Sequence, residues 1–237
     1  MVLVDTVYQR VLALANKEQR GYITPQEFNL FANQAQMDIF EQYFHDLSQF
    51  LRRPGNSTMY SDPVDILEEK IERFHASGTL TDVNDPSNIF PTNDLASGTL
   101  YRLSQVRHNY SSQIGVSVEK LTHDKITSSM LSPLTAPTLR RPAYYLKGTK
   151  IIVTPKTITS VDVNYIRRPV KVEWSGYSVS GSDMYDSTHS VNFELHPSEE
   201  TKLVIKILGL AGVTLKDPSL YQIAGAEDNK NIQQEKQ

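Results

Sequence analysis

The chain has 237 residues, of which 39% are hydrophobic and 22% are charged, and its formal net charge is −3 at pH 7. This composition predicts a folded protein of one or two domains and argues against a globally polybasic nucleic-acid binder. The absence of cysteine excludes disulfides, thiolate metal sites and cysteine nucleophiles.

The charge is unevenly distributed along the chain. Residues 99–175 hold 12 Lys and Arg against 4 Asp and Glu, a net +8, so the remaining residues carry −11. One segment is therefore suited to an acidic partner. No apolar run approaches the roughly 20 residues of a membrane span, and residues 1–15 lack the unbroken apolar core of a signal peptide, so neither membrane insertion nor export is expected.

Residues 1–78 are predicted to be helical. Four aliphatic residues near the N-terminus recur at helical spacing: Val4, Val7, Val11 and Leu14. The second helix begins with a complete capping box, in which Thr24 is the N-cap, Pro25 the first helical residue and Glu27 the reciprocal partner. It ends before residues 52–55, and a third helix is expected from Pro63 to about Phe74.

The second helix has two apolar faces. One stripe consists of Met37, Phe40, Phe44, Leu47 and Leu51. Five further apolar residues lie largely outside that stripe: Phe28, Phe31, Ile39, Tyr43 and Phe50. Two faces indicate two sets of neighbours.

Residues 79–195 are predicted to form a β-rich domain, because proline and small polar residues replace the helical periodicity after Gly78. The expected strands are 100–107, 116–121, 143–146, 150–154, 160–167 and 170–174, with a short helix at 123–131 between two of them. An antiparallel sandwich or barrel is the expected architecture. Residues 176–190 are expected to be a loop or a hairpin tip.

Residues 196–237 are predicted to return to the helical part of the molecule. Pro197 opens a helix with Leu203, Ile207 and Leu210 on one face. A further helix is expected to start at Asp217-Pro218, and the last 11 residues are almost wholly polar. The predicted fold class is therefore α+β: terminal helices that form a bundle, with an inserted antiparallel β-sandwich or barrel-like domain.

Catalytic and metal-binding patterns are weak throughout. The six histidines of the chain are His45, His75, His108, His123, His189 and His196. No two of them have the i, i+4 spacing of a zinc hydrolase. The segment 176–181 resembles a nucleophile elbow around Ser178, but its second glycine comes one residue too late. We therefore expect no enzyme activity, cofactor or metal.

Two further patterns favour a structural interpretation. Gly209 and Gly212, followed by Lys216, lie in or at the end of an apolar helix and not in a phosphate-binding turn. Asp82, Asn84 and Asp85 offer oxygen ligands to a hard cation, but the distal glutamate of a calcium loop is absent, so a solvated turn is the better interpretation.

A basic, aromatic surface is the alternative functional signal. Its candidate cations are Arg140, Arg141, Arg167, Arg168 and Lys171. Tyr144, Tyr145 and Tyr165 lie nearby in the sequence and would allow single strands to stack on a sheet. Adjacent residues of a strand point to opposite faces, however, so only one of each arginine pair belongs to such a surface. A protein or subunit interface is the favoured interpretation.

Several stretches matter for their order along the chain. They are Arg20–Asn29, Ser132–Thr138, Arg141–Tyr145, Ile151–Pro155, Tyr165–Pro169 and the closing helix Phe193–Leu210 with Gly212, Asp217-Pro218 and a Gln-rich end. Taken in this order, they resemble the head-to-tail adaptor or neck-ring proteins of short-tailed, crAss-like bacteriophages. The resemblance covers most of the chain except residues 54–61 and 175–190.

The resemblance implies a non-enzymatic virion protein, assembled in the host cytoplasm. Copies of such adaptors form a ring, commonly twelve-fold, around the DNA exit channel between the portal and the tail. The terminal helices are expected to form a bundle from which the β-rich part projects. Expected partners are further copies, the portal protein, other neck or tail rings and, transiently and without sequence specificity, the passing DNA.

A physical argument favours oligomerisation as well. Burial of apolar surface contributes roughly 25 cal/mol per Å², and a small monomer is not expected to cover both faces of the long helix and most of the C-terminal one. The residues assigned to helix packing, within or between subunits, are Met37, Phe40, Phe44, Leu47, Leu51, Leu203, Ile207 and Leu210. Those assigned to docking on the portal or a neighbour are Leu220, Ile223, Asn229, Gln233 and Gln234.

Two other function classes remain as alternatives to the adaptor. One is a nucleic-acid-binding module that uses the basic aromatic β domain, with Arg140, Arg141, Arg167, Arg168 and Lys171 facing the partner or the channel. The other is a hydrolase that uses Ser178 or an Asp/His pair. Strongly salt-dependent DNA binding would favour the first, and an esterase activity lost in Ser178→Ala would favour the second.

Overall fold

The computed structural model describes residues 1–17, 23–52, 63–81, 89–92, 95, 100–109, 115–179, 182–214 and 226. The chain divides into two compact units. The helical unit comprises Met1–Arg73 and Pro169–Gln237, and the β unit comprises Phe74–Arg168. Both ends of the chain therefore belong to one unit, and the middle of the chain forms the other.

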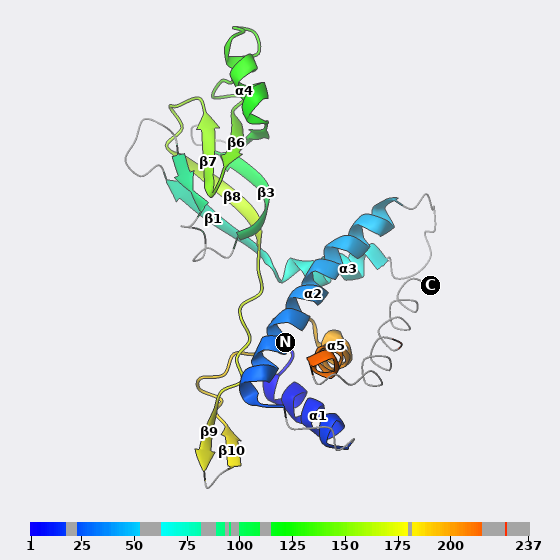
Figure 1. Ribbon diagram of the computed structural model, residues 1–237. Helices are drawn as coiled ribbons and strands as arrows, with labels where there is room; N and C mark the ends of the chain where they lie inside the picture. The colour runs from blue at the N-terminus through cyan, green and yellow to red at the C-terminus, as the bar shows by residue number, and fades with distance from the viewer. Residues whose placement is uncertain are drawn as a thin grey trace. The chain divides into compact units, whose positions relative to one another are not determined.

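The helical unit contains the four long helices of the described chain (Figure 1). They are α1 (Val4–Lys17), α2 (Pro25–Arg52), α3 (Pro63–Glu72) and α5 (Glu200–Thr214), which a short 3-10 helix η3 (Pro197–Glu199) precedes. α5 contacts α1 and α2, and α2 also contacts α3. Tyr8 of α1 lies against Phe28 of α2, with ring centroids 4.8 Å apart. The helices predicted within the described residues are confirmed in type and order, and the further helix expected from Asp217-Pro218 lies outside these residues.

The capping box at the start of α2 is present as predicted. The backbone N–H of Thr24 donates to the carboxylate of Glu27 at 3.0 Å, and the backbone N–H of Glu27 donates to the Thr24 hydroxyl at 3.3 Å. The hydrogen bond from the Thr24 backbone is the main reason that the pKa of Glu27 lies below its usual value. The sequence thus fixes the first residue of the longest helix.

Residues 170–174 do not form the predicted strand of the β domain. They run extended along α2, whose side-chain amides take the place of a neighbouring strand. Asn29 accepts from the backbone N–H of Trp174 at 2.8 Å and donates to its carbonyl at 3.1 Å. Asn33 makes the same pair of bonds with Val172, both at 2.8 Å. Gln36, only 2% exposed, donates to the carbonyl of Val170 at 2.8 Å.

This amide ladder (Asn29, Asn33 and Gln36) has a simple geometric origin. A four-residue step rises about 6 Å along an α-helix, and a two-residue step along an extended chain covers about 6.6 Å. Asn29 and Asn33, four residues apart on the helix, can therefore bind Trp174 and Val172, two residues apart on the extended segment. The predicted domain boundary at 195/196 is wrong for this reason: residues 169–195 belong to the helical unit, and the boundaries lie at 73/74 and 168/169 instead of 78/79 and 195/196.

The N-terminal residues and the single tryptophan complete this unit. Phe193 donates its backbone N–H to the carbonyl of Val2 at 3.1 Å. The indole of Trp174 donates to Asp5 at 3.1 Å and lies 4.5 Å from the ring of Tyr8. Beyond it, β9 (Gly176–Val179) and β10 (Ser182–Tyr185) form the hairpin that the sequence analysis allowed at 176–190.

The β unit is built from two four-stranded sheets and one helix (Figure 1). The first sheet has the order β1-β8-β3-β4. Its strands are His75–Thr81 (β1), Leu100–His108 (β3), Val116–Ser117 (β4) and Ser160–Arg167 (β8). The second sheet has the order β2-β7-β6-β5. Its strands are Ile89–Pro91 (β2), Glu119–Lys120 (β5), Ala143–Lys147 (β6) and Lys150–Thr154 (β7), and α4 (His123–Met130) follows β5.

One buried cluster joins the two sheets. It takes Leu80, Val106, Val161, Val163 and Tyr165 from the first sheet. From the second sheet it takes Phe90, Tyr144, Ile151 and Val153. Buried residues alternate with half-buried ones along most of β7 and β8, as the period of two in the sequence predicts.

The predicted class, α+β with antiparallel sheets, is confirmed at this level. None of the described sheets closes into a barrel. One pairing departs from the expectation, because β5 runs parallel to β6. Within the described part of the chain, no helix is long and apolar enough to cross a membrane.

Candidate oligomerisation and docking surfaces

The predicted packing stripe of α2 is largely covered by the chain itself. Phe40 is fully buried, and its ring meets that of Phe44 edge-on at 5.0 Å. Met37, Phe44 and Leu47 are half-buried. Leu51 lies in α2, but its side chain is outside the described residues.

The stripe of α5 is covered in the same way. Leu203 and Ile207 are fully buried against the neighbouring helices, and Leu210 is half-buried. The second face of α2 is buried too, at Phe28, Ile39 and Tyr43. The premise that one chain cannot cover these faces is therefore wrong: α1, α3, α5 and residues 170–174 cover them.

A buried ion pair strengthens this packing. The ammonium of Lys70 in α3 lies 2.6 Å from a carboxylate oxygen of Glu199 in η3, and Glu199 is 2% exposed. The same ammonium lies 5.6 Å from the centroid of the Tyr43 ring. The single lysine of α3 is thus directed into the unit.

The five predicted cations lie on separate segments of the chain, and two of their predicted aromatic partners are buried. Arg140 and Arg141 lie in the turn before β6, Arg167 ends β8, Arg168 follows it, and Lys171 belongs to the helical unit. Tyr144 and Tyr165, which the sequence suggested as stacking platforms, are 4% and 2% exposed and belong to the core of the β unit. Tyr145, the third predicted ring, is half-buried. A stacking surface needs accessible rings, so the burial of Tyr144 and Tyr165 removes two of the three predicted platforms.

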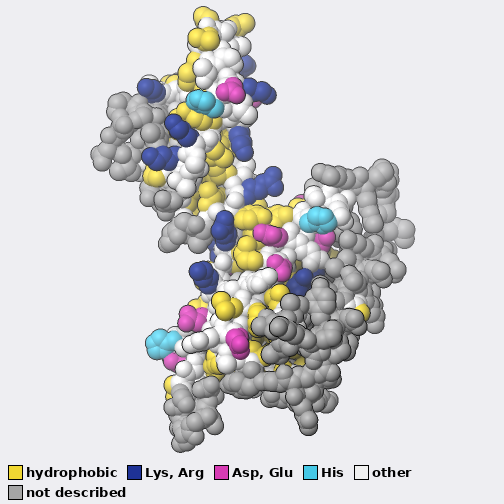
Figure 2. Space-filling model, in the orientation of Figure 1, with side chains coloured by type: hydrophobic (Ala, Val, Ile, Leu, Met, Phe, Trp, Pro, Cys, Tyr) yellow, Lys and Arg dark blue, Asp and Glu magenta, His cyan; other side chains and the backbone are white. Residues whose placement is uncertain are grey.

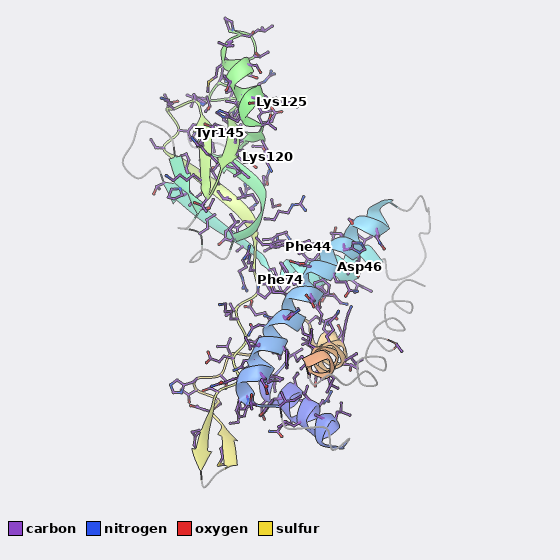
Figure 3. The ribbon with its side chains drawn as sticks, viewed as in Figure 1. Phe44, Asp46, Phe74, Lys120, Lys125 and Tyr145 are labelled. Atoms are coloured by element: carbon purple, nitrogen blue, oxygen red, sulfur yellow. The ribbon has the colours of Figure 1, made fainter. Side chains whose placement is uncertain are left out.

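The β unit nevertheless places two lysines near a tyrosine beside α4. Lys120 of β5 and Lys125 of α4 lie near Tyr145 of β6, where α4 leaves the sheet (Figure 3). His123 contacts Tyr145, with ring centroids 4.9 Å apart. The β unit holds 11 Lys and Arg against 6 Asp and Glu, and the helical unit 13 against 21. The two units therefore have net charges of +5 and −8.

The catalytic alternatives gain no support from the local geometry. Ser178 lies inside β9, where it pairs with Asp183 of β10, and not on a strand-to-helix turn. Gly209 and Gly212 lie within α5. No group of three potential metal ligands occurs among the described residues. The cation candidates Asp82, Asn84 and Asp85 lie outside the described residues, as do the docking candidates Leu220, Ile223, Asn229, Gln233 and Gln234.

One exposed Asp/His pair lies at the base of the β9–β10 hairpin. The imidazole of His189 is 2.6 Å from the carboxylate of Asp186, which also accepts from the backbone N–H of Thr188 at 2.8 Å. The hydrogen bond with His189 lowers the pKa of Asp186, and the same bond raises the pKa of His189. The hydroxyl of Ser190 donates to the backbone carbonyl of Asp186 at 2.6 Å. We therefore interpret the Asp186–His189 pair as part of a hydrogen-bonded turn with a structural role.

An apolar tip that was not predicted from the sequence lies at the end of α4 and is formed by Met130, Leu131 and Leu134. These side chains are 51%, 83% and 94% exposed. Figure 2 shows hydrophobic side chains gathered at this end of the β unit, with cations below them. The sequence contains a signal for this exposure. Leu131 and Leu134 lie among Ser, Pro and Thr, without a helical or strand period that would place them on a buried face.

The acidic face of α3 was missed as well. Asp65, Glu68, Glu69 and Glu72 are exposed, and Ile66 between them is 44% exposed. A helix with an exposed isoleucine among four carboxylates offers both an apolar contact and a negative field.

Comparison with known proteins finds no matching family model and no matching curated protein.

Proposed function

We propose that this protein is a structural component of a bacteriophage virion, a head-to-tail adaptor whose copies form a ring between the portal and the tail. In this proposal it is not an enzyme and needs no cofactor. Its partners are identical copies, the portal protein and other neck or tail rings.

One observation carries the proposal: the two ends of the chain build one acidic helical unit, and the middle of the chain builds one basic β unit. The resemblance implies this nested plan, in which a terminal-helix bundle supports a projecting β domain. We interpret the helical unit as that bundle and the two sheets with their shared core as a sandwich. α1, α2 and α5 pack together from opposite ends of the sequence, which supports the interpretation.

The charges of the units favour protein partners over a firm hold on DNA. A positive channel wall would bind phosphate through counterion release and slow the passage of DNA. The helical unit, at −8, suits a channel wall better than the β unit, at +5. The β unit is then available to acidic protein surfaces.

The proposal also assigns a role to the C-terminal residues. A polar segment has little reason to order except against a partner, so Leu220, Ile223, Asn229, Gln233 and Gln234 are proposed to dock on the portal or on a neighbouring copy.

Co-assembly with the portal protein of the same virus tests this function. The full chain is expected to co-sediment with the portal oligomer, and a chain that ends at Pro218 is expected to lose most of this binding. If the truncated chain binds the portal as well as the full chain does, the docking assignment is wrong. If the full chain does not bind the portal or any other neck component, the adaptor function is wrong.

A further inference from the structure

We propose that the apolar tip (Met130, Leu131 and Leu134) docks on the acidic face of α3 (Asp65, Ile66, Glu68, Glu69 and Glu72) in a second copy of the chain. This inference rests on the proposed function, because it names the contact between identical copies in the ring. Each copy would offer its tip to one neighbour and its α3 to the other.

The tip displays apolar side chains on a fixed backbone. The backbone N–H groups of Leu131 and Ser132 donate to the carbonyls of Ser128 and Ser129, both at 3.3 Å. Ala136 donates to Ser132 at 3.0 Å, and the Thr135 hydroxyl donates to Ser129 at 3.2 Å. Such a preorganised turn loses little conformational entropy on binding. Three exposed apolar side chains within five residues of the chain offer an apolar contact to a partner.

Exposed cations occur in the same segment of the chain as the tip. Lys125, Arg140 and Arg141 are exposed, as is Lys120 at the base of α4. Asp124 and Glu119 are the acidic residues of the same segment, 119–141, whose net charge is therefore +2. Figure 2 shows the blue side chains close below the yellow tip. The partner of this surface must combine an apolar contact with negative charge.

The acidic face of α3 has that combination. Its four carboxylates are exposed, and Ile66 supplies the apolar contact. Lys70 does not compensate the carboxylates on this face, because its ammonium lies 2.6 Å from the buried Glu199. The charge of the face is therefore available to a partner.

A second copy is the partner favoured by charge, because the same chain carries both complementary surfaces. A contact between two different surfaces of identical chains is heterologous, and its repetition from copy to copy gives a closed ring when the rotation between copies closes and an open filament when it does not. The opposite net charges of the two units act in the same direction as the local contact.

Photo-cross-linking of the full chain tests the contact. The chain is prepared with p-benzoylphenylalanine in place of Leu134 and mixed with an equal amount of unmodified, isotope-labelled chain at about 1 mM, where an interface of micromolar Kd is saturated. The expected product joins residue 134 of one copy to residues 63–72 of the labelled copy. Cross-links confined to a single chain, cross-links to another region or the absence of cross-links would overturn the proposal.

Variants separate the contact from general stability. Leu131→Ser with Leu134→Ser is expected to weaken self-association about 100-fold, about tenfold for each leucine, as measured by sedimentation. Met184→Ser is the matched control, since Met184 is 50% exposed on the β9–β10 hairpin and is expected to leave association unchanged.

Charge reversal tests the proposed partner surface directly. Glu68→Lys with Glu69→Lys is expected to weaken association about tenfold, and adding Lys125→Glu with Arg140→Glu is expected to recover most of the loss. Failure of the combined variant to recover any binding, while each pair alone weakens it, would contradict the pairing of these two surfaces.

The outcomes also separate this inference from the proposed function. A ring that forms on the portal with residue 134 cross-linked elsewhere would disprove the contact and leave the adaptor function intact. A contact between the tip and α3 in a protein that never binds neck components would disprove the function alone. Binding of vesicles of phosphatidylcholine and phosphatidylserine through Leu131 and Leu134, without cross-links between copies, would assign the tip to a membrane and overturn the inference.

Discussion

The amide ladder shows how single residues decide the path of the chain. Asn29, Asn33 and Gln36 hold residues 170–174 against α2 and so bring this segment into the helical unit. The sequence alone suggested a strand here, because the alternation of Val170, Val172 and Trp174 is the same whether the neighbour is a strand or a helix. Which partner satisfies the backbone is a tertiary property, and three amides within a helical pattern do not reveal it.

Asn33→Ala tests the ladder. It leaves the N–H and carbonyl of Val172 without the partners that Asn33 supplies, so the free energy of unfolding is expected to fall by about 1–3 kcal/mol. Gln34→Ala is the matched control, because Gln34 is an exposed amide on the same helix and is expected to change stability by less than about 0.5 kcal/mol. Urea denaturation measures both, and equal effects of the two substitutions would contradict the role of the ladder.

Gly176→Ala tests the close packing beside Trp174. An added Cβ would lie 2.6 Å from two indole carbons and 3.0 Å from the carbonyl of Met184, so the indole or the hairpin must move. A loss of about 1–3 kcal/mol is expected, together with a shift in the fluorescence of this single tryptophan. At Gly115 the one close approach of an added Cβ would be to the Asn109 side-chain oxygen, at 3.0 Å, since the Arg107 side chain would lie at an ordinary contact distance of 3.6 Å, and the Asn109 side chain can rotate away. An unchanged emission spectrum in Gly176→Ala would show that the indole is not confined as described.

At the scale of the elements, periodicity and capping predicted the helices, and β-branched alternation predicted most of the longer strands. α2 and β8 have the predicted bounds because their signals are local: a capping box in one and an alternating run in the other. β1 was missed because His75–Thr81 is short in β-branched residues and contains Gly78. That glycine is explained by packing, since a Cβ there would lie 2.8 Å from a methyl group of Leu95. Both surfaces of the proposed contact between copies were missed because exposure depends on the whole fold.

The capping box gives α2 a pH-dependent contribution to stability. The pKa of Glu27 is lower in the folded protein than its usual value of 4.5, so the ionised carboxylate stabilises the helix above that value. This contribution is lost as the pH falls through the lowered pKa. Glu27→Ala is therefore expected to destabilise the protein at neutral pH, with a difference from the wild type that shrinks at acid pH.

Thermal unfolding between about pH 7 and pH 3 measures this effect. Glu41→Ala is the matched control, since Glu41 is an exposed glutamate within the same helix, away from the cap. A difference between Glu27→Ala and the wild type that stays constant down to the lowest pH would contradict the assigned role of the carboxylate.

For the whole molecule, the structure changes the argument for assembly. The apolar stripes of α2 and α5, which first suggested a ring, are mostly covered within one chain, with Phe40, Leu203 and Ile207 fully buried. The case for identical neighbours now depends on the apolar tip, on the acidic face of α3 and on the opposite charges of the two units. The helical spacing of the apolar residues predicted which side chains pack, but it did not tell whether they pack within one chain or between chains.

Native mass spectrometry of the full chain, alone and with the portal protein, tests the central claim most directly. The adaptor account predicts that the portal-bound complex contains many copies of this chain in one fixed number, as a closed ring requires, whether or not the free chain is a monomer. A portal complex with a single copy or with a variable number of copies would contradict it, as would a chain that stays monomeric in the presence of the portal.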